Sequence, residues 1–311
     1  MNGLISRIDG LQRRWKVPAY LWSVQKKYSD DRGGYLSALI TYYGFLSVFP
    51  LLLAAFTVVA YVLQGDQSAI RSLENHVGSY PIIGPAAHQL QGKSLHGQPF
   101  ALVIGVLGLI WGAQGLAQAA QFTMEEAWNQ PNRVRAGFVP RTLRSFGWYA
   151  VFGLGVVIST FISSIGAWLG WTGGDILSTL VAVVFDMGLF VLCFRIVSPR
   201  GIPVRDLVPG AAVAGVAWAI LTGVGVGLVH LLAHSNSLYG TFTPVLALLG
   251  FIYLMARITI LAVEANVVRA RRLWPRSLTS ENLTAADLAQ LEQLAGKEER
   301  VETERVDVEV R

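Results

Sequence analysis

The 311-residue sequence has a single cysteine, Cys193, and only 14% of its residues are charged. One cysteine cannot form an internal disulfide, so the fold does not depend on an oxidising compartment. Soluble domains carry about 25% charged residues, and the deficit therefore argues against an ordinary soluble protein. We expect no cleavable signal peptide, because the first apolar run begins near residue 35 and is too long for one.

What the sequence has instead is a set of six long apolar runs, at residues 35–63, 99–121, 146–169, 176–197, 207–233 and 242–263. Each can cross a hydrocarbon core of roughly 30 Å at about 1.5 Å per helical residue. Inside lipid, every spanning backbone group must bond within its own helix. The predicted fold class is therefore all-α, a polytopic membrane protein with six transmembrane helices.

Lys and Arg gather on alternate sides of these runs. The N-terminal segment, the second and fourth connections and the segment after the last run are basic, whereas the odd-numbered connections hold only Arg71 and Lys93. Positive charge stays cytoplasmic, so both termini are predicted to lie inside. The clusters predict attraction to anionic lipid at the cytoplasmic face. They lack interleaved aromatic residues, which argues against nucleic acid as the partner.

The charge pattern divides the chain into three predicted parts. Residues 1–34 form a cytoplasmic amphipathic segment, 35–264 a transmembrane domain with a long outer loop at 64–98, and 265–311 a cytoplasmic tail that is first basic and then acidic, with a disordered end. In the first part, apolar residues at three-to-four spacing (Leu4, Ile8, Leu11, Trp15) suit a helix lying on the inner leaflet. A helix packed on the protein's own loops fits equally well. In the tail, Thr284 and Asp287 predict the capped start of a short helix ending near Ala295.

Two features predict how the spans are shaped and packed. Pro50 lies near the middle of the first run, where a proline removes one backbone bond and favours a kink. Small residues at four-residue spacing, such as Gly155 in the third run and Gly215 in the fifth, let helix backbones approach closely in lipid.

Ionisable residues inside spans are costly and therefore informative. Asp186 lies in the fourth run, and Arg257 lies in the sixth, seven residues before Glu264 and on the same helical face. Their depths permit Asp186 and Arg257 to form a charge pair that lines a substrate or proton path. The alternatives are a purely structural pair, or an Arg257 side chain that extends to the interface.

A polar stripe follows the second run, with side chains that share one helical face: Gln114, Gln118, Gln121 and Glu125. Amides facing lipid are unfavourable, so the stripe should face the bundle. It either bonds neighbouring helices together or lines a polar cavity.

Metal-binding and catalytic signals are weak. His230 and His234 are four residues apart, a spacing that suits metal, but the string lacks the glutamate of a zinc protease. Ordinary outer-surface histidines are the favoured interpretation, and no cofactor is predicted. No combination of a nucleophile with a base can be assembled, so we expect no enzymatic activity.

Several strings resemble the YihY/virulence-factor-BrkB family of inner-membrane proteins. They include the segments 38–50, 204–211, 237–240, 251–254 and 263–266, and the residues that carry the likeness are Tyr42, Tyr43, Ser47, Pro50, Pro209, Gly210, Tyr239, Gly240, Glu264 and Asn266. The chain departs from the family where it has Ala262-Val263 in place of Gly-Ala, and Phe251 where tryptophan is common. The resemblance covers about residues 30–275, and its motifs are specific when taken in order.

This resemblance implies a multi-pass protein of the bacterial plasma membrane. It implies a transporter or permease-like function for an unidentified solute or a lipid or envelope component. A non-transporting membrane scaffold for envelope proteins is the alternative. Some members have carried the label ribonuclease BN, which this sequence does not support, because the predicted cytoplasmic side has no histidine for a metal site. Whether the protein forms a homo-oligomer is left open.

Overall fold

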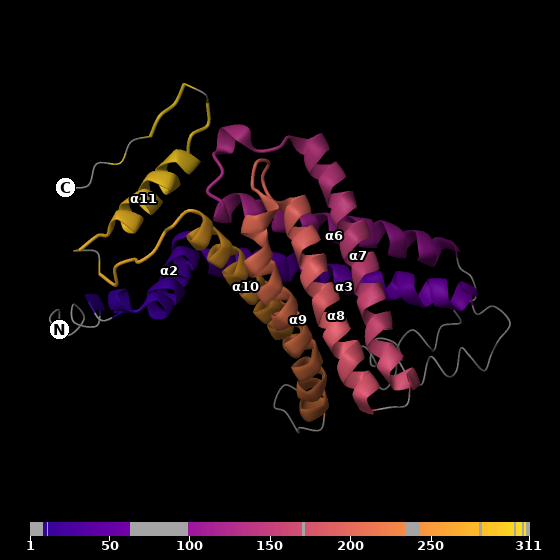
Figure 1. Ribbon diagram of the computed structural model, residues 1–311. Coiled ribbons are helices and arrows are strands. Elements are labelled where there is room, and N and C mark those ends of the chain that lie inside the picture. Colours follow the sequence, from indigo (N-terminus) through magenta and orange to yellow (C-terminus); the bar gives the residue numbers. More distant parts are fainter. Residues whose placement is uncertain are drawn as a thin grey trace. The chain divides into compact units, whose positions relative to one another are not determined.

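The computed structural model describes residues 9–10, 12–62, 99–169, 172–233, 243–279, 282–301, 303–306 and 308. All regular secondary structure in these ranges is helical (Figure 1). The α-helices are α2 (Lys16–Asp30), α3 (Gly33–Val62), α6 (Pro99–Ala127), α7 (Phe138–Leu169), α8 (Thr172–Val197), α9 (Val204–Ala233), α10 (Thr243–Ala270) and α11 (Ala285–Lys297). A short 3-10 turn, η1 (Asn132–Val134), precedes α7. The all-α prediction is confirmed.

In the described part of the chain, four helical segments are long and apolar enough to cross a membrane by length and composition. They are Phe138–Ser163, Ile176–Val197, Val204–Thr222 and Val245–Ala270, and they match the third to sixth predicted spans. The first two predicted runs lie in α3 and α6, where many side chains are outside the described part of the chain.

The chain divides into two compact units. Unit 1 comprises residues 1–37, 117–218 and 257–311, and unit 2 comprises residues 38–116 and 219–256. Helices α3, α6, α9 and α10 contribute residues to both units. The candidate site described below lies within unit 1.

Small residues set the helix spacing in unit 1. Helix α7 packs against α8, and a Cβ placed at Gly155 would lie only 2.3 Å from Leu189 Cδ1. At Gly215 on α9, a Cβ would lie 2.7 Å from the backbone nitrogen of Met187 on α8. Close backbone approach of this kind is how membrane helices associate. The packing predicted from the small-residue spacing is thus present at these two positions.

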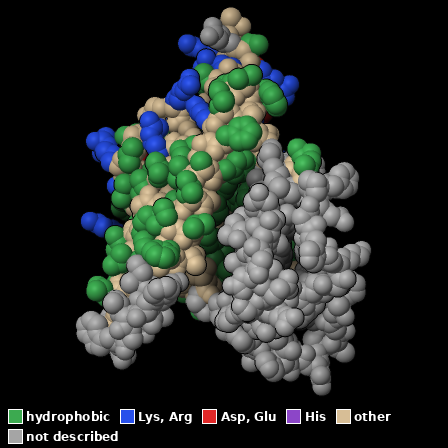
Figure 2. All heavy atoms as spheres, turned by 90° about the vertical axis from the view of Figure 1, so that its right-hand side faces the viewer, with side chains coloured by type: hydrophobic (Ala, Val, Ile, Leu, Met, Phe, Trp, Pro, Cys, Tyr) green, Lys and Arg blue, Asp and Glu red, His purple; other side chains and the backbone are tan. Residues whose placement is uncertain are grey.

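Large apolar side chains cover the outside of α7 and α8. Leu154, Val157 and Phe161 are exposed along α7, as are Leu180 and Val184 along α8. Figure 2 shows hydrophobic side chains spread over the described helices, with Lys and Arg gathered mainly towards one end. An apolar surface of this extent suits hydrocarbon rather than water as its solvent.

In unit 2, the tyrosine-rich start of α3 contacts α6. A Cβ at Gly115 would lie 2.2 Å from the ring of Tyr43, and one at Gly112 would lie 3.1 Å from Ser47 Cα. Tyr43 and Ser47 belong to the family-like strings, and their role here is close helix packing. Helix α3 continues through position 50, while the side chain of Pro50 lies outside the described part, so the predicted kink stays a prediction.

The structure tests the prediction for the C-terminal helix but not the whole prediction for the N-terminal helix. Helix α11 has Thr284 as its N-cap, and Thr284 and Asp287 form a reciprocal capping box, which confirms the predicted helix start. In the N-terminal part, the described helix α2 begins at Lys16, after Trp15. The predicted apolar positions Leu4, Ile8 and Leu11 lie outside the described residues.

Candidate functional site

The most unusual feature of unit 1 is a set of three charged side chains with no solvent exposure. The Lys27 ammonium lies 3.1 Å from a carboxylate oxygen of Glu264 and also pairs with Asp31, and all three side chains are 0% exposed. Lys27 Nζ further donates a hydrogen bond of 2.8 Å to the carbonyl of Ala127. We call Lys27, Asp31 and Glu264 the buried triad.

Local structure explains how the triad is assembled. Lys27 and Asp31 are four residues apart at the C-terminal end of α2, so their side chains lie on one helical face. Arg32 then adopts a positive φ of 54° and turns the chain directly into α3. Glu264 comes from α10, and Ala127 is the last residue of α6. Three helices thus converge on one lysine.

The charges of the triad do not balance. Two carboxylates share one ammonium, and Glu264 Oε1 accepts no hydrogen bond from any described residue. Burial raises the pKa of Asp31, and the Lys27 charge offsets this only in part. Burial opposes the charge on Lys27, yet the Glu264 and Asp31 carboxylates outweigh it and raise the Lys27 pKa. Lys297 approaches Asp31 Oδ1 to 3.9 Å, but its closer partner is Glu126 at 2.8 Å.

Two residues beyond Glu264, the side chain of Asn266 links α10 to α9. Its oxygen accepts a 2.7 Å hydrogen bond from the backbone N–H of Gly210, and its nitrogen donates one of 2.9 Å to the Leu207 carbonyl. A Cβ at Gly210 would lie 2.1 Å from the carbonyl oxygen of Ala262, so only glycine permits this approach. These contacts hold α10, the helix that carries Glu264, against α9 at a point close to that glutamate.

Pro209 completes this link. A proline inside a helix has no N–H for the carbonyl four residues earlier, which here is that of Arg205. Arg269 on α10 donates to that carbonyl at 2.9 Å. The family-like residues Pro209, Gly210 and Asn266 thus act together as a helix–helix junction.

A second buried ion cluster lies in the same unit and is centred on Asp287 of α11. Its carboxylate pairs with Lys26 and Arg276, each at 2.9 Å, and accepts the backbone N–H groups of Ser277 and Thr284. Arg276 also pairs with Asp30 at 2.7 Å. Burial opposes ionisation of Asp287, but these donors outweigh it and lower its pKa. We call Lys26, Asp30, Arg276 and Asp287 the tail cluster.

The structure gives Asp186 and Arg257 different neighbours. Asp186 lies beside the Ser159 hydroxyl of α7, whereas the Arg257 guanidinium lies over the Tyr28 ring, 5.9 Å from its centroid. Neither takes part in an ion pair among the described residues, so their predicted pairing rests on helical depth alone. Glu264, expected on the face of Arg257, binds Lys27 instead.

The glutamine stripe is engaged at its inner end. Gln121 donates to the Arg141 carbonyl at 3.1 Å and to the Ser145 hydroxyl at 3.0 Å, and Glu125 pairs with Arg141 at 2.8 Å. These contacts join α6 to α7. Gln118 is partly exposed, and Gln114 has a buried oxygen that finds no hydrogen-bond partner among the residues described.

Several predicted residues lie outside the described residues or have side chains that do. These are Pro50, His230, His234, Tyr239 and Gly240. The weak metal candidate formed by the two histidines therefore stays a prediction. Tyr42, next to the packed Tyr43, is exposed.

Sequence reasoning named Glu264 but missed Lys27 and Asp31. Both fall in residues 1–34, which the sequence predicted to be a cytoplasmic amphipathic segment. The one available signal was the four-residue spacing between a lysine and an aspartate, which predicts a helical pair without showing that it is buried.

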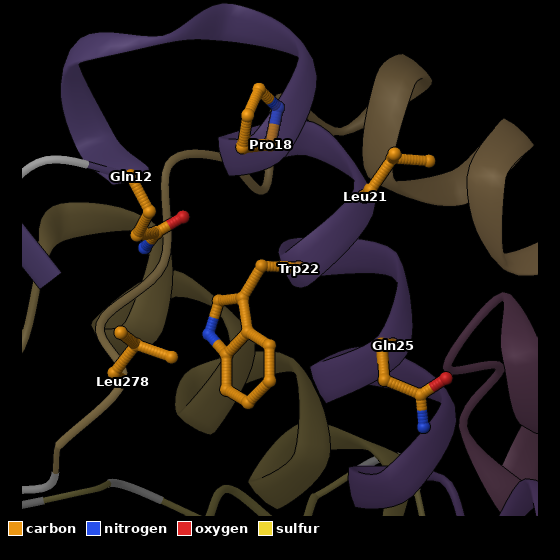
Figure 3. Close-up of a pocket in the computed structure, with 6 residues that line it drawn as sticks. All are labelled: Gln12, Pro18, Leu21, Trp22, Gln25 and Leu278. Carbon is orange, nitrogen blue, oxygen red and sulfur yellow. The ribbon is translucent and has the colours of Figure 1, made fainter. Parts of the chain in front are cut away.

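An apolar groove lies beside the tail cluster at the surface. It has a volume of about 390 Å³ and is lined by Gln12, Pro18, Leu21, Trp22, Gln25 and Leu278 (Figure 3). The Trp22 indole donates to the Ser277 carbonyl at 3.3 Å, which fixes the ring at the groove wall.

The chain is similar to a known protein family over most of its length. Residues 24–285 match the family model described as virulence factor BrkB. A protein of Bacillus subtilis (strain 168), named as the ribonuclease-like protein YfkH, is 21% identical over 280 residues, which is 85% of this chain and 98% of that protein. An uncharacterized protein of Dickeya dadantii (strain 3937) is 26% identical over 279 residues, or 80% of this chain and 83% of that protein. No solved structure gives a significant match.

The family match includes Lys27, Asp31 and Glu264 as well as the Asn266 junction. Together with the long apolar helices, it indicates an integral membrane protein that crosses the bilayer several times. The chain belongs to the virulence factor BrkB family.

Proposed function

We propose that the protein is a transporter of the bacterial plasma membrane, for an unidentified solute or a lipid or envelope component. The observation that supports this is the buried triad. Two carboxylates share one ammonium at the end of the last apolar helix, with no solvent exposure. Buried ionisable groups in membrane proteins are costly and often mark ion or proton pathways.

The chemistry of the triad favours a proton as the coupling ion. With all three groups ionised, the site carries one excess negative charge, and burying an unpaired carboxylate is strongly unfavourable. Binding one proton removes the excess. Glu264 Oε1, which has no hydrogen-bond partner in the part of the chain that the structure describes, offers a place for that proton. A conformation that admits water to the triad favours proton release, so proton binding would bias the equilibrium between two conformations.

The proposal includes a topology. We place six spans in the membrane, with both termini and the triad on the cytoplasmic side. Reporter fusions after residues 90 and 236 should report the outside, and fusions after 138, 203 and 280 the cytoplasm. A cytoplasmic signal from the fusion at 90 would contradict the six-span arrangement.

Transport is tested with inside-out membrane vesicles that contain the full chain and carry an imposed pH gradient, followed by an amine dye. Amino acids, sugars, nucleosides and lysophospholipids are added one class at a time. At least one class should dissipate the gradient in wild-type vesicles but not with Glu264→Gln. Glu292→Gln, which neutralises an exposed glutamate of α11, is the control and should behave as wild type.

If every class leaves the gradient the same in wild-type, Glu264→Gln and empty vesicles, proton-coupled transport is excluded for those solutes and a scaffold becomes the better proposal. The groove with exposed Leu21 at its edge gives that alternative a surface for envelope proteins. A scaffold would keep its partners after Glu264→Gln.

We further propose that the protein is not an enzyme. Within the described residues, no three His, Cys, Asp or Glu side chains lie where they could hold a metal ion. The ribonuclease-like name belongs to the Bacillus relative. The purified chain should leave a tRNA precursor intact in the presence of Mg²⁺ or Mn²⁺, and cleavage abolished by Glu264→Gln would refute this.

A further inference from the structure

Three arginines at one end of the α7–α8 pair have no acidic partner within the described ranges. Arg144 lies near the start of α7, Arg195 near the end of α8, and Arg200 just after α8. None of them takes part in an ion pair among the described residues, in contrast to Arg141, which pairs with Glu125.

The packing of the two helices brings these arginines to the same end of the helix pair. Gly155 and Leu189 are in contact, which fixes the register of α7 against α8. Arg144 is eleven residues before Gly155, so it lies about 16 Å along the axis from that contact. Arg195 is six residues after Leu189, about 9 Å away in the same direction, and Arg200 lies farther along.

The electrostatics agree with this placement. The positive charges of Arg200 and Arg195 both act on Arg144, and the opposing negative charge that acts on it, that of Glu125, is already paired with Arg141. Three mutually repelling guanidinium groups in one place cost free energy unless an anion binds among them. Guanidinium groups favour phosphate, which they bind through paired N–H donors.

Exposed apolar side chains lie next to the arginines. Leu143 and Phe146 flank Arg144 on α7, and Leu192 lies one turn before Arg195 on α8; these side chains are 66%, 49% and 48% exposed. A free phosphate ion has no apolar surface to place against such neighbours. A lipid has a phosphate for the guanidinium groups and acyl chains for the apolar side chains.

We propose that Arg144, Arg195 and Arg200 form a binding site for the phosphate headgroup of an anionic phospholipid. Its acyl chains lie against Phe146 and Leu192, which are on the inner side of Arg144 and Arg195 along their helices. The sequence predicted anionic lipid along the whole cytoplasmic face, and the structure assigns it to one end of α7 and α8. The inference is independent of the proposed transport.

The test measures binding of single lipids to the detergent-purified full chain by native mass spectrometry. Phosphatidylglycerol is compared with phosphatidylcholine and with inorganic phosphate. The site variant is Arg144→Gln/Arg195→Gln/Arg200→Gln. The control variant, Arg14→Gln/Lys16→Gln/Arg271→Gln, also removes three positive charges, all from exposed side chains.

The site variant should bind phosphatidylglycerol at least about tenfold more weakly than wild type, and the control variant within about threefold, because only clustered charges form a site. Equal loss in both variants would overturn the site, since it would mean diffuse attraction. Inorganic phosphate that displaces phosphatidylglycerol at equal concentration would overturn the lipid assignment. Thermal unfolding of both variants within a few degrees of wild type ensures that binding, not folding, is compared.

Discussion

The buried triad and the tail cluster lie in the same unit, yet they solve the burial of charge in opposite ways. In the tail cluster, two carboxylates meet two cations, and Asp287 also accepts two backbone N–H groups. In the triad, two carboxylates share one buried cation, with Lys297 only at 3.9 Å from Asp31, and an oxygen of Glu264 has no donor among the described residues. A balanced cluster suits a fixed structure, whereas an imbalanced one suits a site that changes its charge.

The pKa shifts follow the same division. Asp287 has a lowered pKa, so its ionised form is favoured in the folded protein. Asp31 has a raised pKa, so its folded form holds a proton more tightly than the unfolded chain does. The tail cluster therefore stabilises the folded protein most when Asp287 is ionised. Protonation of one acid of the triad, in contrast, lowers the free-energy cost of burying its charges.

The largest effect should come from removing the shared cation. Lys27→Met leaves two buried carboxylates facing each other, and we expect a loss of about 3–5 kcal/mol in the free energy of unfolding. Unfolding in detergent measures it, and Lys16→Met, at an exposed lysine, is the control. Adding Asp31→Asn and Glu264→Gln should restore most of the loss. A loss below about 1 kcal/mol in the single variant would show that the triad carries little charge in the folded state.

A smaller loss is expected in the tail cluster. Asp287→Asn removes charge-assisted hydrogen bonds and should cost about 2–3 kcal/mol, because Arg276 keeps its second partner, Asp30. The same unfolding measurement applies. A cost above that of Lys27→Met would reverse the comparison and make the tail cluster the more strained of the two.

The pH dependence of Asp287→Asn separates the clusters further. The ordinary pKa of an aspartate is 3.8, and that of Asp287 is lower in the folded protein. Its stabilisation is therefore complete above 3.8 and is lost as the pH falls below that value. Wild-type stability should drop in this acidic range, and the variant should show a flatter profile. Parallel profiles would mean that other carboxylates dominate acid unfolding.

A substitution in the Asn266 junction tests whether the position of Glu264 contributes to the loss of unfolding free energy, separately from the charges of the triad. Gly210→Ala places a Cβ against Ala262 and Asn266, and overpacking of this kind costs about 2 kcal/mol. Gly188→Ala on α8, where a Cβ meets nothing within 4 Å, is the matched control and should be neutral or slightly stabilising. If Gly210→Ala also abolishes the response of the vesicles in the transport assay, the position of Glu264 matters as well as its charge.

The smallest effect should come from an ion pair near solvent. Arg133 and Glu299 pair at 3.1 Å with partly exposed side chains. Glu299→Gln should change the unfolding free energy by less than about 1 kcal/mol and less still at high salt. A larger cost would mean that the end of the tail is held more firmly than this pair indicates.

Local patterns in the sequence were sufficient for part of this structure. The apolar runs predicted helices 146–169, 176–197, 207–233 and 242–263, because hydrophobic length is a property of consecutive residues. The capping box at Thr284 and Asp287 was equally local, and the structure forms it. Glu264 was recognised because a charged residue in an apolar helix is conspicuous without any knowledge of its surroundings.

Only the tertiary structure decided what each of these charges meets. Helical spacing put Arg257 and Glu264 on one face, but it could not tell that Arg257 lies over Tyr28 while Glu264 reaches Lys27, more than two hundred residues earlier in the chain. Such partners depend on how each helix is rotated about its axis. That rotation is set by contacts such as Gly215 with Met187 and Gly210 with Asn266, which join residues far apart in sequence. The sequence by itself therefore determined which residues are helical and apolar, and packing between distant helices determined which charges became buried together.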